Sequence, residues 1–331
     1  MNISIANIQS FFLHPLVLLV VFMAASLAMI WLLHMMESKG FEGTVLGTLI
    51  MPYCSGFPNL VFAYVMSSSA KNGGLVIENC LVNNATNLTL ILGLAAIFGA
   101  TAAIQKRVSK RESRQREEFH RINRLNLLFT LIALFLFTGT LWALAKDGVL
   151  DFYDGLVLVS LFLFWQVLHV FEVLKDNIRK NRSFHWSLLI DILLLGVSAY
   201  CVYFSVEHLV DWVKTSHTPY LSFARLGWFS GLLMVVPNAV LALYYTRIDR
   251  QDIVLSSQIG DGHICIPMCI GLFAVFKPIH VPDFFQIGAF IILGAGAVHF
   301  LSLVMLGKVP RSVGVGLIGA YAFFLYKGLI Q

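Results

Sequence analysis

Residues 78–94 read ENCLVNNATNLTLILGL, an apolar stretch in which three asparagines follow one another at intervals of four residues. On a helix, side chains four positions apart lie on one face, so Asn79, Asn83 and Asn87 form a single polar stripe. Such a stripe is costly on a helix within a lipid bilayer unless it meets protein, water or an ion. The stretch therefore predicts a polar site inside a membrane-spanning helix.

The composition of the whole chain is that of a membrane protein. Of the 331 residues, 58% are hydrophobic and 12% are charged, whereas a soluble domain carries about 25% charged residues. The mean hydropathy is +0.80. This balance excludes a water-soluble enzyme, a disordered chain and a nucleic-acid binder, and the sequence contains neither a His-Glu-x-x-His motif nor a Gly-x-Ser-x-Gly elbow. We expect an all-α membrane protein that is not an enzyme.

Ten apolar runs can each supply the roughly 20 residues that a spanning helix needs. The 23 Lys and Arg residues are divided unevenly between the two sides that these runs define, 17 against 6. Because cytoplasmic loops collect basic residues, the imbalance predicts a multi-pass protein of the cell (inner) membrane with both termini outside the cytoplasm. The one long polar stretch, 101–125, is predicted to be a basic cytoplasmic loop with a short surface helix. The predicted spans are 14–35, 42–69, 74–99, 126–145, 152–173, 186–207, 224–246, 252–276, 284–306 and 312–330.

A second part of the chain repeats the pattern of the first. Pro58-Asn59 and Pro237-Asn238 are 179 residues apart, and residues 256–272, SSQIGDGHICIPMCIGL, follow the second pair as residues 78–94 follow the first. The copies occupy spans two and three, and spans seven and eight. Since five spans, an odd number, separate them, they must face opposite ways across the bilayer, as in transporters with inverted repeats. We expect two halves of five spans each, 1–173 and 174–331.

The polar and helix-breaking residues of both copies form the candidate site. Pro58 and Pro237 lack an N–H and crowd the preceding turn, which predicts interrupted helices with free carbonyl groups. Such groups are tolerated at membrane depth only where they line a cavity. Amide oxygens, hydroxyls and free carbonyls make a cage of low charge that suits a hard cation. The candidate ion-lining residues are Ser55, Asn59, Glu78, Asn79, Asn83, Asn87, Asn238, Ser257 and Asp261, and the candidate hinges are Gly56, Pro58, Pro237 and Pro267.

These two segments resemble the paired signature repeats of the sodium/calcium exchanger superfamily, the cation/calcium antiporters. In that family each repeat reads roughly Thr-Ser-x-Pro-Glu, then Gly-Asn-x-x-Gly-Ser-Asn-x-x-Asn before an apolar Leu-Gly-Leu. Here residues 55–59, SGFPN, match the first block and residues 78–94 match the second. The resemblance implies ten membrane helices in two inverted five-helix repeats. It further implies a secondary active antiporter with alternating access at a midplane site between spans two and three and spans seven and eight.

The resemblance also implies the partners of the chain. We expect a small inorganic ion such as sodium, calcium or a proton, surrounding membrane lipid, no nucleic acid and no cofactor. The number of subunits is not fixed by the sequence.

The chain departs from the family pattern at the charged positions. The paired acidic residues that follow proline in the family are Asn59 and Asn238 here, and the last Asn or Asp of the second copy is Cys265. Calcium prefers six to eight oxygen ligands including carboxylates, so the departures predict an altered ion selectivity. Asp261 is then the central carboxylate, able to balance a monovalent cation or to take up a proton. The candidate metal ligands are Asp261, Asn83, Asn59 and Asn238.

Structural roles for the same residues stay open. The asparagine stripe could hold helices together through hydrogen bonds, and Asn59 and Asn238 could cap broken helices. Glu78 could be a solvated carboxylate near the start of its span. The alternative function is a non-transporting membrane subunit or scaffold that kept the exchanger fold and lost the ion site.

Overall fold

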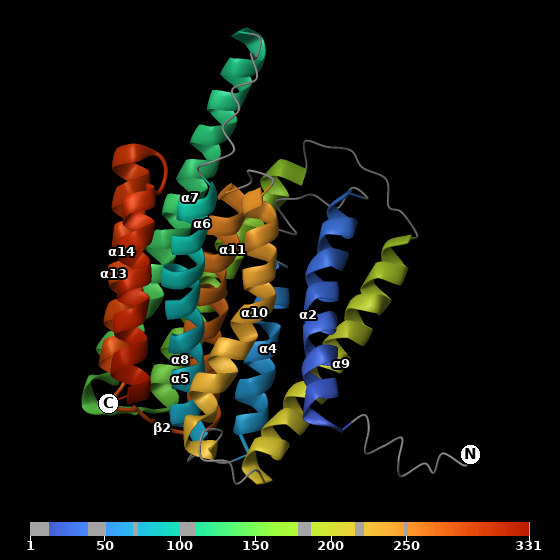
Figure 1. The fold of residues 1–331 in the computed structure, drawn as a ribbon, viewed down its shortest axis with the longest axis vertical. Coiled ribbons are helices and arrows are strands. Elements are labelled where there is room, and N and C mark those ends of the chain that lie inside the picture. The colour runs from blue at the N-terminus through green and yellow to red at the C-terminus, as the bar shows by residue number, and fades with distance from the viewer. Residues whose placement is uncertain are drawn as a thin grey trace.

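The computed structural model describes residues 13–38, 51–68, 72–99, 110–177, 187–215, 222–247 and 251–330, and these residues form a bundle of helices (Figure 1). Only two strands occur in the described ranges, β1 (Val149–Leu150) and β2 (Ile279–His280). The predicted all-α class is therefore confirmed. The α-helices are α2 (Pro15–Ser38), α4 (Met51–Met66), α5 (Gly73–Ala85), α6 (Leu92–Phe98), α7 (Lys110–Leu144), α8 (Phe152–Asn177), α9 (Ser187–Thr215), α10 (Leu226–Arg247), α11 (Gln251–Ile264), α12 (Gly271–Phe276), α13 (Phe285–Leu306) and α14 (Arg311–Leu325).

Seven stretches of the described chain are long and apolar enough to cross a membrane. They are Pro15–Leu32, Gly73–Phe98, Arg124–Asp147, Leu189–Thr215, Phe223–Arg247, Ile253–Phe276 and Phe285–Leu306. Helices α4, α8 and α14 lie at three further predicted spans, but their apolar parts are shorter. The chain is thus an integral multi-pass membrane protein, and the total of ten spans stays a prediction.

The basic segment before the fourth predicted span differs from the expectation. Instead of a loop with a separate surface helix, residues 110–125 continue into the span as one helix, α7, of 35 residues. Residues 101–109 of the predicted loop lie outside the described residues. The chain carries no Gly or Pro between Lys110 and Thr138, so nothing in the backbone ends the helix where the sequence becomes polar. Figure 1 shows α7 reaching beyond the neighbouring helices at one end of the bundle.

The prediction that Pro58 and Pro237 interrupt their helices is wrong. Both prolines lie inside continuous helices, α4 and α10. Each proline removes one backbone hydrogen bond, and here the rest of the helix continues through that loss.

The interruptions occur instead in the helices that follow. α5 passes into a π-helical turn, η3 (Thr86–Ile91), before α6, and α11 passes into a second, η7 (Cys265–Ile270), before α12. Pro267 lies within η7 and has no N–H to donate to the ladder. The hydroxyls of Thr86 and Thr89 in η3 donate to the Val82 and Ala85 carbonyls at 2.7 and 2.5 Å. π turns are uncommon and are frequent at functional sites, so both repeat segments carry the same rare feature.

Helices from the first half of the chain pack on helices from the second half. α5 packs on α10 and α4 packs on α11, so the two segments of the sequence repeat meet at the centre of the bundle. Outside them, α6 packs on α14 and α12 packs on α8. Further large contacts join α7 to α13, α7 to α11 and α2 to α9, and the α2–α9 pair lies along one side of the bundle (Figure 1).

Glycine contacts allow α14 to approach α6 closely, and α8 to approach α12. A Cβ on Gly314 of α14 would lie 2.7 Å from the Gly93 carbonyl oxygen of α6, and one on Gly155 of α8 would lie 2.7 Å from the Gly271 carbonyl oxygen of α12. Small residues are the usual means by which membrane helices bring their backbones together. The α6–α14 and α8–α12 interfaces therefore use the same device.

The connections at one end of the bundle are joined through β1 and β2. Val149 pairs with His280 and Leu150 with Ile279 in an antiparallel ladder. The Val281 N–H also donates to the Gly148 carbonyl at 2.9 Å, and the Lys277 ammonium donates to the Ser67 carbonyl. These contacts place the connection between α7 and α8 and the connection between α12 and α13 beside the end of α4, at the same end of the bundle.

A bulky residue at Gly314 should destabilise the protein. In Gly314→Leu the new side chain meets the α6 backbone, and overpacking of this kind costs about 1–3 kcal/mol. In the matched variant Gly316→Leu, on the same helix, the added Cβ has no atom within 4 Å. We expect a lower melting temperature in detergent for the first variant and no change for the second. Equal melting temperatures would show that the α6–α14 contact does not require glycine.

Candidate functional site

Asp261 is the centre of the buried polar site. Its side chain, on α11, is fully buried and accepts three hydrogen bonds, each from a different helical element. The Ser55 hydroxyl of α4 donates to Oδ1 at 2.5 Å, the Asn87 amide of η3 donates to Oδ2 at 2.9 Å, and the Asn238 amide of α10 also donates to Oδ2. Both copies of the sequence repeat thus contribute to one carboxylate.

The asparagine stripe extends the network along α5 and η3. The Asn87 amide N–H group also donates to the Asn83 carbonyl oxygen at 3.0 Å, and Asn83 donates in turn to the Asn59 carbonyl oxygen at 3.4 Å. One turn further, Asn79 donates to the Ser230 hydroxyl at 2.9 Å. The four asparagines are all completely buried, so the predicted stripe faces protein and not lipid.

Among the residues that the structure describes, no ion pair involves Asp261. Burying a carboxylate is expensive unless it is hydrogen-bonded or paired. Here the amide N–H groups of two asparagines and one hydroxyl stabilise it, as donors to a charged acceptor do.

The asparagine amides of the site can offer either N–H donors or carbonyl acceptors. Three buried amide atoms of the site have no hydrogen-bond partner among the described residues: Asn59 Nδ2, Asn79 Oδ1 and Asn87 Oδ1. An asparagine that rotates by half a turn about its last side-chain bond exchanges its N–H donors for a carbonyl acceptor. The same residues that now donate to Asp261 can therefore turn oxygens toward a cation.

Two predicted lining residues lie outside this network. The Ser257 hydroxyl donates to the Val254 carbonyl of its own helix at 3.1 Å and accepts from Gln258 at 3.2 Å. Glu78 lies against α10, where a Cβ on Gly227 would meet its Oε2 at 2.7 Å. That Oε2 is buried and has no hydrogen-bond partner among the described residues.

The predicted hinge residues show packing roles. A Cβ on Gly56 would lie 2.8 Å from the Ile264 side chain, so this glycine allows α4 to approach α11. Pro58 and Pro237 are buried within continuous helices, and Pro267 is buried in η7. Whether Gly56, Pro58, Pro237 and Pro267 act as hinges stays a prediction.

A second buried polar side chain on α5, Asn84, was not predicted. Asn84 donates to the Cys80 carbonyl at 2.7 Å, and its carbonyl oxygen lies 2.8 Å from where Gly262 would carry a Cβ. The thiols of Cys80, Cys265 and Cys269 contact one another beside it. The described residues contain no group of three or more His, Cys, Asp or Glu side chains that could hold a metal ion. Asn84 stood next to Asn83 in the sequence, but one residue of helix turns it toward α11 and η7.

Two buried histidines fix the neighbouring helices. His263 Nε2 lies 2.9 Å from the Thr130 carbonyl of α7. His299 of α13 places Nε2 2.8 Å from the Leu88 carbonyl inside η3. A lone histidine in an otherwise apolar span was the one sequence signal for this contact. His299 thereby stabilises the turn that carries Asn87.

Loss of the His299 imidazole should weaken the π turn. In His299→Leu the Leu88 carbonyl is left buried without its donor, which costs about 1–3 kcal/mol. His299→Gln keeps an N–H donor and should recover most of the stability, while His280→Leu, at an exposed position, should have little effect. Thermal unfolding in detergent measures all three. A stable His299→Leu protein would argue against a role for His299 in holding η3.

Comparison with known proteins finds similarity to sodium/calcium exchangers. The family model described as sodium/calcium exchanger protein matches residues 10–171, and no curated protein matches the chain. Structures of the sodium-calcium exchanger NCX_Mj align over nearly the whole length. The form soaked with 2.5 mM Na⁺ and 10 mM Sr²⁺ has a TM-score of 0.65 and 19% identity over 97% of this chain and 98% of that one.

Two further forms of NCX_Mj give similar values. The form soaked with 2.5 mM Na⁺ and 0.1 mM Ca²⁺ has a TM-score of 0.65 and 18% identity over 99% of both chains. The form soaked without Na⁺ or Ca²⁺ has a TM-score of 0.64 and 17% identity over 95% and 97%. At this identity the alignment shows a shared fold. Together with the family match over residues 10–171 and the multi-pass helical bundle, it makes the chain similar to the sodium/calcium exchanger proteins.

Proposed function

We propose that this protein is a secondary active cation antiporter that works by alternating access at a midplane site around Asp261. The observation that carries the proposal is the convergence of Ser55, Asn87 and Asn238 on that carboxylate. These donors come from the two segments that the sequence repeats, which is how secondary transporters form a central site. A small inorganic cation is the substrate class that a lone carboxylate among amides suits.

The packing supports ten spans in two inverted repeats, 1–173 and 174–331. Exchanging each helix for its counterpart five spans away turns the α4–α11 contact into α10–α5, and the α6–α14 contact into α12–α8, and all four contacts exist. The π turns η3 and η7 and the Gly93–Gly314 and Gly155–Gly271 contacts are exchanged in the same way. A two-fold relation of this kind is the basis of alternating access, since each half can take the arrangement of the other.

The count of charges favours a monovalent cation or a proton over calcium. Asn59 and Asn238 stand at the positions where the family carries acidic residues, which leaves Asp261 as the one acid in the hydrogen-bonded network. A divalent ion at low dielectric needs more countercharge than one carboxylate supplies. A cation and a proton compete for the same Asp261 oxygens, so binding of one releases the other, which provides the coupling of an antiporter.

Binding of a cation requires the asparagines to reorient. In the present arrangement Asn87 and Asn238 direct N–H groups at Asp261. Rotation of these amides brings carbonyl oxygens to the position where the N–H groups lie, and the cation then bridges them to the carboxylate. A protonated Asp261 can instead donate to a carbonyl oxygen, so both loaded forms keep the buried groups hydrogen-bonded or coordinated.

The closed network also favours one alternative. A carboxylate already satisfied by Ser55, Asn87 and Asn238 is what a non-transporting subunit or scaffold would retain as a structural polar core. The two functions differ in one respect, because only the antiporter needs the negative charge of Asp261.

The orientation and surroundings complete the proposal. The excess of basic residues on one side favours a protein of the cell (inner) membrane with both termini outside the cytoplasm. Membrane lipid is the other expected partner, since many large apolar side chains, including Ile190 and Leu193 of α9, are exposed on the outside of the bundle.

Ion flux in liposomes tests the proposal directly. Purified protein should exchange sodium or potassium against an imposed proton or cation gradient, and Asp261→Asn should reduce the flux to that of protein-free liposomes, because the variant cannot balance the ion. Asp283→Asn makes the same chemical change at an exposed position and should transport normally. Folded wild-type protein without flux for sodium, potassium, calcium or protons would favour the scaffold.

Restoring the family's acidic residues should create calcium binding. The double variant Asn59→Glu/Asn238→Glu places three carboxylates around the site and should gain calcium-dependent stability, about 2.7 kcal/mol at a calcium concentration 100 times Kd. The double variant Asn59→Gln/Asn238→Gln has side chains of the same length without charge and should show no such gain. Thermal shift with and without calcium measures both. If the two variants respond alike, charge at these positions does not set the selectivity.

A further inference from the structure

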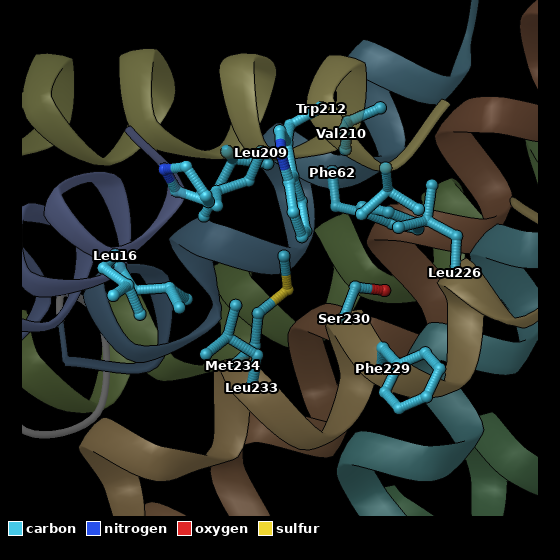
Figure 2. Close-up of a pocket in the computed structure, with 14 residues that line it drawn as sticks. Leu16, Phe62, Leu209, Val210, Trp212, Leu226, Phe229, Ser230, Leu233 and Met234 are labelled. Carbon is cyan, nitrogen blue, oxygen red and sulfur yellow. The ribbon is translucent and has the colours of Figure 1, made fainter. Parts of the chain in front are cut away.

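A cavity of about 450 Å³ lies apart from the Asp261 site. It is enclosed by the first part of α2, the last part of α9, the first part of α10 and Phe62 of α4 (Figure 2). Leu16 and Trp212 line it and are also 65% and 36% exposed, so the cavity opens to the outside of the bundle. Apart from Phe62, its walls belong to helices that are apolar enough to cross the membrane.

The lining of the cavity is unsuited to an ion or to water. Ser230 is the only lining residue with a hydroxyl, amide or charged side chain, and it is already engaged, accepting from Asn79 and donating to the Gly227 carbonyl at 3.1 Å. A buried water needs two to four polar partners, and an apolar cavity of about 150 Å³ stays dry and takes up benzene. A chamber about three times that volume is therefore expected to hold hydrocarbon.

The rim of the cavity is suited to an anionic headgroup. Arg225 directly precedes the lining residue Leu226, is exposed, and forms no ion pair with any residue that the structure describes. Trp212 lines the cavity from the last turn of α9, and tryptophan is enriched where membrane helices meet the headgroup region. An acyl chain in the cavity would thus place its phosphate near a cation.

We infer that this cavity binds one acyl chain of a membrane phospholipid, with the phosphate at Arg225. The floor of the site is formed by Ser230 and Met234, and both accept hydrogen bonds from Asn79, at 2.9 and 3.3 Å. The bound chain therefore lies directly against one end of the asparagine stripe and shields that end from water. The site does not depend on which ion is carried, or on whether one is carried.

Binding of lipid to the delipidated full-length protein tests the inference. Native mass spectrometry with an anionic diacyl phospholipid should show one tightly bound molecule per chain. Val210→Trp fills the cavity, since Val210 lines it and is 3% exposed, and should weaken this binding about tenfold or more. Val197→Trp makes the same change at a 52% exposed position of the same helix and should bind as the wild type does. Arg225→Gln should weaken binding of the phospholipid but not of an uncharged single-chain detergent.

Two further variants test whether misfolding explains the result and whether the cavity holds water instead of lipid. Leu19→Phe fills the cavity from α2, so the result does not depend on the folding of Val210→Trp. Equal lipid binding by Val197→Trp and the filled variants would overturn the inference. Rapid labelling of Leu233→Cys by a charged thiol reagent would do so too, because it would show an aqueous vestibule. Lipid binding is read without ion flux, so it can fail or succeed independently of the antiporter proposal.

Discussion

The hydrogen bonds to the Asp261 carboxylate are the interaction on which the centre of the structure depends. A charged oxygen pair inside an apolar bundle must be satisfied by donors, because an unsatisfied buried charge costs far more than a helix contact supplies. Ser55, Asn87 and Asn238 are those donors, and they lie on α4, η3 and α10. Helices separated by more than 150 residues are thereby held at one point, and the packing of α5 on α10 and α4 on α11 follows from it.

The features of the site that follow from helical period could be predicted from the sequence. Asn79, Asn83 and Asn87 share a face whatever surrounds them, and the structure places all three in buried hydrogen bonds. The central place of Asp261 followed from the cost of an acid in an apolar span. The all-α class and the approximate helix positions followed from the apolar runs alone.

What the sequence did not predict depends on contacts between distant segments or on the tolerance of a helix to local change. Pro58 and Pro237 looked like breaks, but a helix packed on its neighbours survives the loss of one hydrogen bond. The π turns are invisible to residue spacing, since their sequences, TNLTLI and CIPMCI, have little in common. Likewise, His299 and Leu88 meet only because α13 packs on η3.

The two π turns also determine the directions in which side chains point before and after each turn, in α5–α6 and in α11–α12. A π turn amounts to one additional residue in an α-helix, so the positions on either side of it are out of phase around the axis. In the first copy, the part before the turn directs Asn79 at Ser230 and Asn83 at Asn59, while the part after it directs Gly93 at α14. One membrane segment can thus face a polar partner before the turn and a close-packed apolar partner after it. A uniform α-helix would not point these two sets of residues in the same directions. Removing a single amino acid from either turn would therefore rotate a whole half-helix, which makes these short segments far less tolerant of deletions than their ordinary composition suggests.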